Sequence, residues 1–175
     1  MLLQNAEEAD YPAIIELANA AYRGSGPGAS WNMEEGILDG QRMDDALLRE
    51  ELAERQDGFL MTYREESGGP LLGTFWLDPK QDGVWYLSLF MVRPDMQNQR
   101  LGRSLLEAAE EFAKQRGGRQ MRMSVLQVRA TLIAWYERRG YRATGETQPF
   151  PYEDARLGKP LRDDLYFLVF EKQLG

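Results

Sequence analysis

The chain has 175 residues, 43% of them hydrophobic and 28% charged, with a formal net charge of −7 at pH 7. The length suits one hydrophobic core, so we expect residues 1–175 to form a single domain. The negative charge argues against nucleic acid as a partner, because such binding depends on neutralising phosphates. The chain has no cysteine and no histidine, which excludes disulfides, thiolate chemistry, Ser-His triads and most zinc sites, and we expect no metal.

The sequence carries no sign of a membrane segment or a leader. No stretch of about 18 apolar residues is present that could cross a bilayer. The first ten residues have neither the basic start nor the apolar run of a signal peptide. We therefore expect a cytoplasmic protein without a membrane partner.

In chain order, the apolar pattern alternates between strand and helix periods. The first helix has Asp10 as its N-cap and Pro12 in its first turn, and the second begins at Asp44 or Asp45. Strands are predicted at residues 2–3, 59–64, 71–77, 85–92, 120–126, 141–145 and 165–171. Helices are predicted at 11–23, at about 31–34, from 44 or 45 to 56, from 101 to 116, and at 130–139.

The loops of this pattern are equally informative. Residues 24–30 alternate glycine with small residues but follow a helix and lack the lysine of a P-loop, so we expect a mobile loop beside a substrate site. Short turns join residues 59–92 into an antiparallel meander. A helical connection makes 120–126 a parallel neighbour of 85–92. Residues 148–160 are predicted to form an irregular loop.

The segment 85–106 organises the chain. A buried strand ends at Val92, a short polar turn follows, and a helix begins near Gly102. The first N–H groups of a helix have no partner within it and point at whatever lies beyond its start, which favours an anion such as phosphate. Arg93, Arg100 and Arg103 add positive charge. The alternative is an ordinary strand–helix connection with a charged rim.

A second segment, 132–141, is an amphipathic helix with an aromatic end, and Gly140 is its predicted C-cap. By itself this pattern is typical of a packing element. However, Tyr136-x-x-x-Gly140-Tyr141 resembles a motif of the GNAT N-acetyltransferases, and Gln97-x-x-Arg100-x-Gly102 resembles the acetyl-coenzyme A pyrophosphate loop of the same family. The two motifs occur in the family's order, although Arg100 and Arg129 replace the usual glycine and asparagine.

The resemblance implies a GNAT fold of the α/β (α+β) class with three layers. In this fold a mixed, mostly antiparallel sheet of about seven strands has helices on both faces and a V-shaped split between its two central parallel strands. It also implies direct transfer of an acetyl group from acetyl-coenzyme A to a primary amine in a ternary complex. Tyr136 would be the general acid that protonates the departing thiolate.

By the same resemblance, the end of the central strand would hold the pantetheine arm and polarise the thioester, and the following turn would bind the diphosphate. Arg129 would replace a pantetheine contact or add a phosphate contact. The implied coenzyme-binding residues are Phe90, Met91, Val92, Gln97, Asn98, Gln99, Arg100, Leu101, Gly102, Arg103, Ser104, Arg129 and Tyr136.

The acceptor side is less defined. Glu34 and Glu35 are candidates for the general base, with solvated surface carboxylates as the alternative. Candidate walls of the acceptor pocket are the aromatic residues Tyr22, Trp31, Trp85 and Phe150, each of which also suits a core position. A small-molecule or amino-acid-like amine is the expected acceptor. The alternatives are a peptide N-terminus and a non-catalytic acyl-coenzyme A sensor, and a homodimer is expected by analogy alone.

Overall fold

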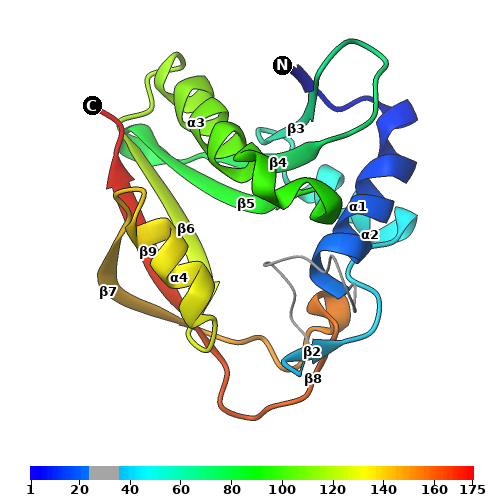
Figure 1. The fold of residues 1–175 in the computed structure, drawn as a ribbon. Coiled ribbons are helices and arrows are strands. Elements are labelled where there is room, and N and C mark those ends of the chain that lie inside the picture. Colours follow the sequence, from blue (N-terminus) through cyan, green and yellow to red (C-terminus); the bar gives the residue numbers. More distant parts are fainter. Residues whose placement is uncertain (24–35) are drawn as a thin grey trace.

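Seven strands form one mixed sheet in the order β1-β3-β4-β5-β6-β9-β7, in which only β5 and β6 are parallel neighbours (Figure 1). The computed structural model describes residues 1–23 and 36–175, with backbone alone at 97–99. The strands are β1 (Leu2–Asn5), β3 (Phe59–Arg64), β4 (Gly73–Pro79), β5 (Val84–Val92), β6 (Gln120–Leu126), β7 (Arg142–Pro149) and β9 (Tyr166–Gln173). Two further short strands, β2 (Leu38–Asp39) and β8 (Lys159–Pro160), pair with each other.

The helices cover both faces of the sheet, as expected for three layers. The longer ones are α1 (Tyr11–Arg23), α2 (Asp45–Glu54), α3 (Leu101–Lys114) and α4 (Ala130–Glu137). Helices α3 and α4 bury their apolar sides on one face, and α1 and α2 pack on the other. Among the described residues no helix combines the length and the hydropathy needed to cross a membrane.

A bulge in β5 exchanges the two faces of that strand. Trp85 and Leu87 point into the core under α3, but beyond the bulge Phe90 takes that face, and Leu89 points toward α1 and α2. In the pairing with β4, Leu89 and Phe90 together oppose the single residue Phe75. Leu89 has a φ of 48°, in the left-handed region. An extra residue in one strand leaves the ladder locally unpaired and turns the following side chains over.

The two parallel strands separate after a short paired segment. Only Val84, Trp85 and Tyr86 of β5 are in register with β6, although both strands continue for several residues. In Figure 1 the two strands start side by side and diverge, so that β6 continues with β9 while β5 stays with β4. The expected V-shaped split of the sheet is therefore confirmed.

Several element boundaries differ from the predictions. β7 continues to Pro149, through a stretch predicted as loop, because an irregularity between Ala143 and Thr147 lets the strand resume its pairing with β9. Asp10 does not cap α1: it closes a capping box with Glu7 around the 3₁₀ turn Glu8–Asp10. Asp44 does cap α2, accepting from the N–H of Leu47 at 2.8 Å. The short helix predicted near 31–34 and the glycine-rich loop 24–30 lie outside the described residues.

Candidate active site

The split between β5 and β6 opens into a pocket of about 230 Å³. Its walls come from the diverging halves of both strands, from α1, from α4 and from the segments around β2 and β8. The lining residues are Tyr22, Leu38, Arg42, Tyr86, Leu87, Ser88, Leu89, Phe90, Met123, Ser124, Val125, Leu126, Arg129, Leu132, Tyr136, Phe150, Leu157 and Phe167. A cavity of this kind, mostly apolar with a few polar groups, is typical of a small-molecule site.

The bulge of β5 forms one wall of the pocket. The hydroxyl of Tyr22, in the last turn of α1, donates to the carbonyl oxygen of Phe90 at 3.3 Å. Because a bulge breaks the regular pairing of a strand, backbone groups at this point can face a ligand instead of β4. Phe90 thus lies where the sequence placed it, in the pocket, whereas Met91 and Val92 are buried in the cores on either side of the sheet.

Tyr136 lies in α4 at the opposite wall. Its side chain is 5% exposed and packs against the rings of Phe90, Trp135 and Tyr141, with 6.4 Å between the centroids of Phe90 and Tyr136. Burial raises the pKa of the Tyr136 phenol well above its ordinary value, and Tyr22 adds to this effect. The hydroxyl therefore stays protonated at neutral pH and can act as a proton donor.

The start of α3 follows β5 after the 3₁₀ segment η3 (Pro94–Gln99). Arg100 has φ 59° and ψ 14°, in the left-handed region that favours glycine. This explains why the resembled motif has glycine at that position. The N–H of Ser104 bonds to the carbonyl of Arg100 at 3.0 Å. The N–H groups of Leu101 to Arg103 precede it and have no acceptor inside the helix.

The arginines around this helix start are partly neutralised. Arg93 donates to both carboxylate oxygens of Asp95 and holds the pKa of that carboxyl below its usual range. Arg103 donates to Glu107 at 2.8 Å on the exposed side of α3. The anion-binding capacity of this region therefore depends mainly on backbone N–H groups and the helix dipole.

Arg129 lies at the junction of β6 and α4 and lines the pocket. Its N–H donates to the carbonyl of Leu126, and its own carbonyl accepts from Ile133. The backbone thus turns sharply out of the strand and into the helix. The predicted residues Phe90, Arg129 and Tyr136 come together around one cavity, although Phe90 is far from the other two in the sequence.

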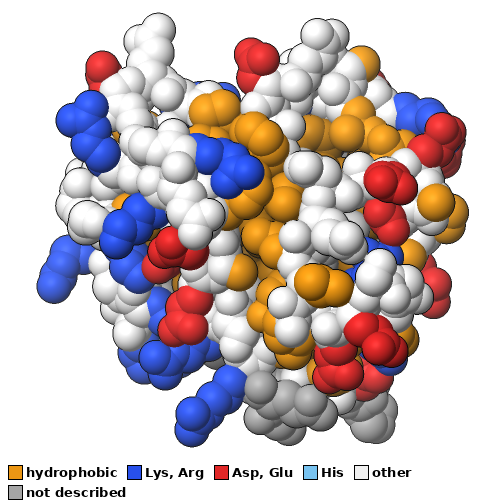
Figure 2. All heavy atoms as spheres, turned by 90° about the horizontal axis from the view of Figure 1, so that it is seen from above, with side chains coloured by type: hydrophobic (Ala, Val, Ile, Leu, Met, Phe, Trp, Pro, Cys, Tyr) orange, Lys and Arg blue, Asp and Glu red, His pale blue; other side chains and the backbone are white. Residues whose placement is uncertain are grey.

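Charge is unevenly distributed over the molecule. In Figure 2, whose left and right match those of Figure 1, most basic side chains lie on the left, the side of α4 and β7. Most acidic side chains lie on the right, the side of α1 and α2, and apolar side chains form a band between them. On the face shown in Figure 2, basic and acidic side chains are therefore separated although the net charge is −7, and the basic part of this face favours an anionic ligand.

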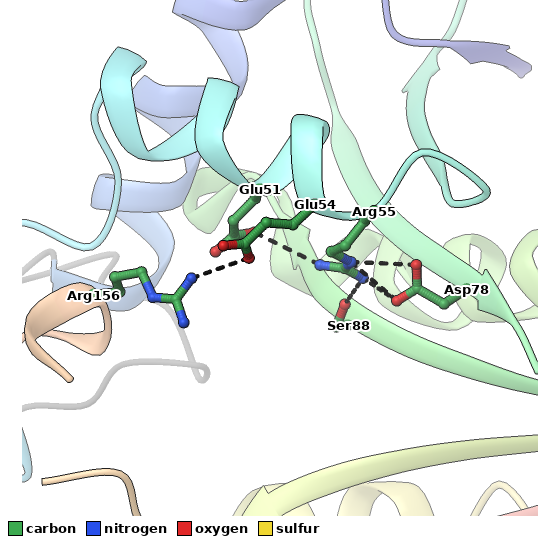
Figure 3. Close-up of polar contacts among 6 residues, drawn as sticks. All are labelled: Glu51, Glu54, Arg55, Asp78, Ser88 and Arg156. Atoms are coloured by element: carbon green, nitrogen blue, oxygen red, sulfur yellow. Dashed lines mark hydrogen bonds and ion pairs between the residues drawn. The ribbon is translucent and has the colours of Figure 1, made fainter. Parts of the chain in front are cut away.

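A polar cluster behind the pocket fixes β5 against α2 (Figure 3). Arg55, which follows α2, donates to both oxygens of Asp78 and to Oγ of Ser88 at 2.7 Å, and its guanidinium lies 3.9 Å from the centroid of the Trp76 ring. The Ser88 hydroxyl lines the pocket. A second ion pair, between Glu54 and Arg156 at 3.1 Å, joins α2 to the 3₁₀ turn Ala155–Leu157, next to the pocket wall.

A second polar bridge closes the narrow end of the split. The hydroxyl of Tyr86, the last paired residue of β5, forms a hydrogen bond with the hydroxyl of Ser124, two residues beyond the pairing in β6. Ser124 also donates to the side-chain oxygen of Gln148 in β7 at 2.9 Å. Polar groups therefore hold the strands together where the main-chain ladder ends.

Two of the aromatic residues predicted as acceptor walls line the pocket, and a third does not. Tyr22 and Phe150 line the pocket. Trp85 does not, because it lies at the paired end of β5 and packs with Phe59 and Phe112 under α3. The remaining predicted acceptor residues, Trp31, Glu34 and Glu35, lie outside the described residues.

Two kinds of lining residue were missed by the sequence reasoning. Ser88 and Ser124 are polar positions inside otherwise apolar strands, and that interruption was a signal for a cavity between them. Arg42 had no local signal, because its place in the pocket depends on the docking of its segment against α1. The lining contains two arginines, Arg42 and Arg129, and no carboxylate among the described residues.

Comparisons with known proteins agree on one family. The family model described as the acetyltransferase (GNAT) family matches residues 11–141. A mycothiol acetyltransferase from Saccharopolyspora erythraea is 30% identical over 134 residues, covering 74% of this chain and 39% of that protein. The chain thus spans about two fifths of the length of that relative.

Solved structures match over nearly the whole chain. A putative GNAT acetyltransferase from Desulfovibrio desulfuricans has a TM-score of 0.70 at 16% identity, with 99% of each chain covered. The ribosomal-protein-S18-alanine N-acetyltransferase from Escherichia coli has a TM-score of 0.67 at 20% identity, covering 99% of this chain and 94% of that one. At these identities the similarity shows the fold.

Proposed function

Because the chain belongs to the GNAT family of acetyltransferases, we propose that it transfers an acetyl group from acetyl-coenzyme A to the amine of an acceptor. The observation that carries the proposal is the split between β5 and β6. Residues of the β5 bulge and the buried tyrosine Tyr136 line the single pocket at this split. Acetyl-coenzyme A would supply the acetyl group as an activated thioester.

The residues present fit this coenzyme. A diphosphate needs several convergent N–H donors, and the first turn of α3 offers those of Leu101, Gly102 and Arg103. The extended pantetheine arm needs a narrow passage with main-chain groups along it, which the separating strands offer. Arg129 at the start of α4 and the basic side of the molecule favour a ligand with negative charge.

In this proposal the β5 bulge positions the thioester and polarises its carbonyl group. Backbone N–H groups that are fixed before the reaction stabilise developing negative charge on an oxygen, which is typically worth about 3–4 kcal/mol of barrier. The Tyr22–Phe90 hydrogen bond and the Arg55–Ser88 hydrogen bond fix this strand from α1 and from the end of α2. These two contacts support the bulge from the side of α1 and α2.

Tyr136 is the proton donor in this proposal. Its raised pKa keeps the proton on the phenol at neutral pH, and the direction of the shift follows from burial. A thiolate that leaves a thioester is a good leaving group, and protonation stabilises the departing sulfur and disfavours its attack on the product. The chain has no cysteine or histidine for a covalent route, so direct attack by the amine is the consistent path.

The proposal is tested by a transfer assay. Purified protein is incubated with acetyl-coenzyme A and single amines from three groups: amino acids, simple primary amines and peptides with a free N-terminus. Release of free thiol is followed together with mass spectrometry of the acceptor. We expect thiol release that needs both protein and amine and that yields an acetylated product. Binding of acetyl-coenzyme A without acetyl transfer to any of the three groups would support a sensor and contradict the proposal.

A further inference from the structure

One lining residue of the pocket carries a charge that the described residues leave uncompensated. Nη1 of Arg42 is buried and has no hydrogen-bond partner in the described part of the chain. Three other buried side-chain nitrogens share this state, namely Trp76 Nε1, Arg122 Nε and Arg139 Nε, but only Arg42 belongs to a residue that lines the pocket. A buried guanidinium nitrogen without a partner is costly, and at the wall of a pocket it is a candidate contact for a bound ligand.

The backbone of Arg42 is held in place from α1. Oδ1 of Asn19 accepts from the N–H groups of Arg42 and Met43, at 2.7 and 3.1 Å, and Nδ2 of Asn19 donates to the carbonyl of Met43 at 2.8 Å. Met43 is 1% exposed and anchors the segment in the core. The guanidinium carbon lies 5.4 Å from the centroid of the Tyr22 ring. Arg42 is therefore preorganised on the α1 side of the pocket.

Other arginines near the pocket have carboxylate partners, whereas no carboxylate partner is found for Arg42 among the described residues. Arg55 has Asp78 and Glu51 as partners, and Arg156 has Asp154 and Glu54. No carboxylate lines the pocket in the described part of the chain, so its lining is positive although the protein is acidic. A planar guanidinium matches a carboxylate in geometry and charge.

We propose that Arg42 binds a carboxylate of the acceptor, so that the amine substrate is an amino acid or another small amine that carries a carboxylate. This inference rests on the proposed function, since it concerns the acceptor of that reaction. The pocket volume of about 230 Å³ suits a small molecule. Tyr22 and Phe150 line the same pocket and would cover the rest of the acceptor, and Tyr136 lies across the pocket in α4.

The test compares each amino acid with its carboxamide, and rates are expressed per unprotonated amine, because the carboxylate also raises the pKa of the neighbouring amine. The kcat/KM of amino acids is measured beside that of their carboxamides, for wild type, Arg42→Gln and Arg42→Lys. The control is Arg49→Gln on the exposed surface of α2, where Arg49 pairs with Glu8 and Asp45 outside the pocket. Thermal unfolding with acetyl-coenzyme A is recorded for every variant, which separates loss of fold or coenzyme binding from loss of acceptor recognition.

We expect wild type and Arg49→Gln to prefer the acid over the amide by at least about tenfold, the value of one charge-assisted hydrogen bond. Arg42→Gln should lose this preference, and Arg42→Lys should keep part of it, with an unchanged shift from acetyl-coenzyme A. Equal rates for acid and amide in wild type would overturn the inference, whatever the variants do. So would a preference that survives in Arg42→Gln. In both cases the proposed acetyl transfer would remain valid, and only the role of Arg42 would be wrong. If no amine were acetylated at all, the proposed function itself would be wrong.

Discussion

The hydroxyl of Tyr22 donates a hydrogen bond to the carbonyl oxygen of Phe90, with 3.3 Å between the two oxygen atoms. This contact joins the last turn of α1 to the bulge of β5, two elements separated by most of the meander. The bulge decides which backbone groups of β5 face the pocket. The orientation of the bulge backbone is thus determined in part by α1, which packs on the face of the sheet opposite α3 and α4.

Replacing Tyr22 by phenylalanine should weaken this connection. We expect a loss of about 1 kcal/mol in the free energy of unfolding, the usual value of one partly buried hydrogen bond, and a larger relative loss in kcat. Urea denaturation and steady-state kinetics give the two numbers. Tyr11→Phe is the control, because Tyr11 lies at the other end of the same helix, where Arg49 lies over its ring. Equal effects of both substitutions would argue against a role for the Tyr22–Phe90 contact.

Replacing Tyr136 by phenylalanine should reduce kcat by about 10²- to 10⁴-fold, the usual contribution of a general acid. The ring contacts with Phe90 and Tyr141 remain, so the thermal shift caused by acetyl-coenzyme A should be unchanged. Tyr166→Phe is the control, since Tyr166 is exposed on β9. A Tyr136→Phe variant with the wild-type kcat would remove this residue from the mechanism.

Arg55→Met should destabilise the protein by about 2–3 kcal/mol, because it leaves the mostly buried carboxylate of Asp78 without its partner. The substitution keeps an apolar stem over Trp76. Arg49→Met, at an exposed ion pair, should leave stability nearly unchanged. Chemical denaturation of the two variants measures the difference. Similar losses of stability in the two variants would mean that the Arg55–Asp78 ion pair in Figure 3 contributes no more than an exposed ion pair.

Stability should fall at alkaline pH. Burial raises the pKa of Tyr141, whose hydroxyl also donates to Glu110, whereas an unfolded chain has the ordinary value of 10.0. Below pH 10 the phenol is protonated in both states and its contribution is constant. Above pH 10 the unfolded chain loses a proton that the folded protein keeps, so the free energy of unfolding falls by about 1.4 kcal/mol per pH unit for each such tyrosine.

Denaturation between pH 9 and pH 11 tests this prediction. Tyr141→Phe should show a shallower decline with pH than wild type, because one of the buried phenols is gone. Glu110 keeps its ion pair with Lys172 in that variant. Tyr166→Phe should decline like wild type, since an exposed tyrosine titrates similarly in both states. Identical slopes for all three proteins would contradict the assigned cause.

The sequence predicted the elements with strong periodicity and clear end signals. β6 was predicted at its observed bounds, Gln120–Leu126, because it alternates in exposure and lies between two helices. α3 was found from its apolar stripe and the glycines at 117 and 118. The family resemblance predicted that Phe90 and Tyr136 belong to one site, and both residues line the pocket between β5 and β6.

Other features depend on contacts that no local pattern contains. β2 and β8 have two residues each and pair across about 120 positions of sequence, so neither has a period to detect. The alternation of β5 is reversed at the bulge and does not show where the strand leaves its neighbour, and Trp85 was therefore predicted as a pocket wall although it lies in the core. Arg42 reaches the pocket only because Asn19 binds its backbone.

The central claim is that the split between β5 and β6, with the start of α3, binds acetyl-coenzyme A. Thermal unfolding with and without acetyl-coenzyme A tests it most directly, with free coenzyme A in parallel. At 100 times its dissociation constant the ligand should add about 2.7 kcal/mol to the free energy of unfolding, which is a visible rise in Tm. An unchanged Tm at millimolar acetyl-coenzyme A would contradict the claim, and the proposed reaction would fall with it.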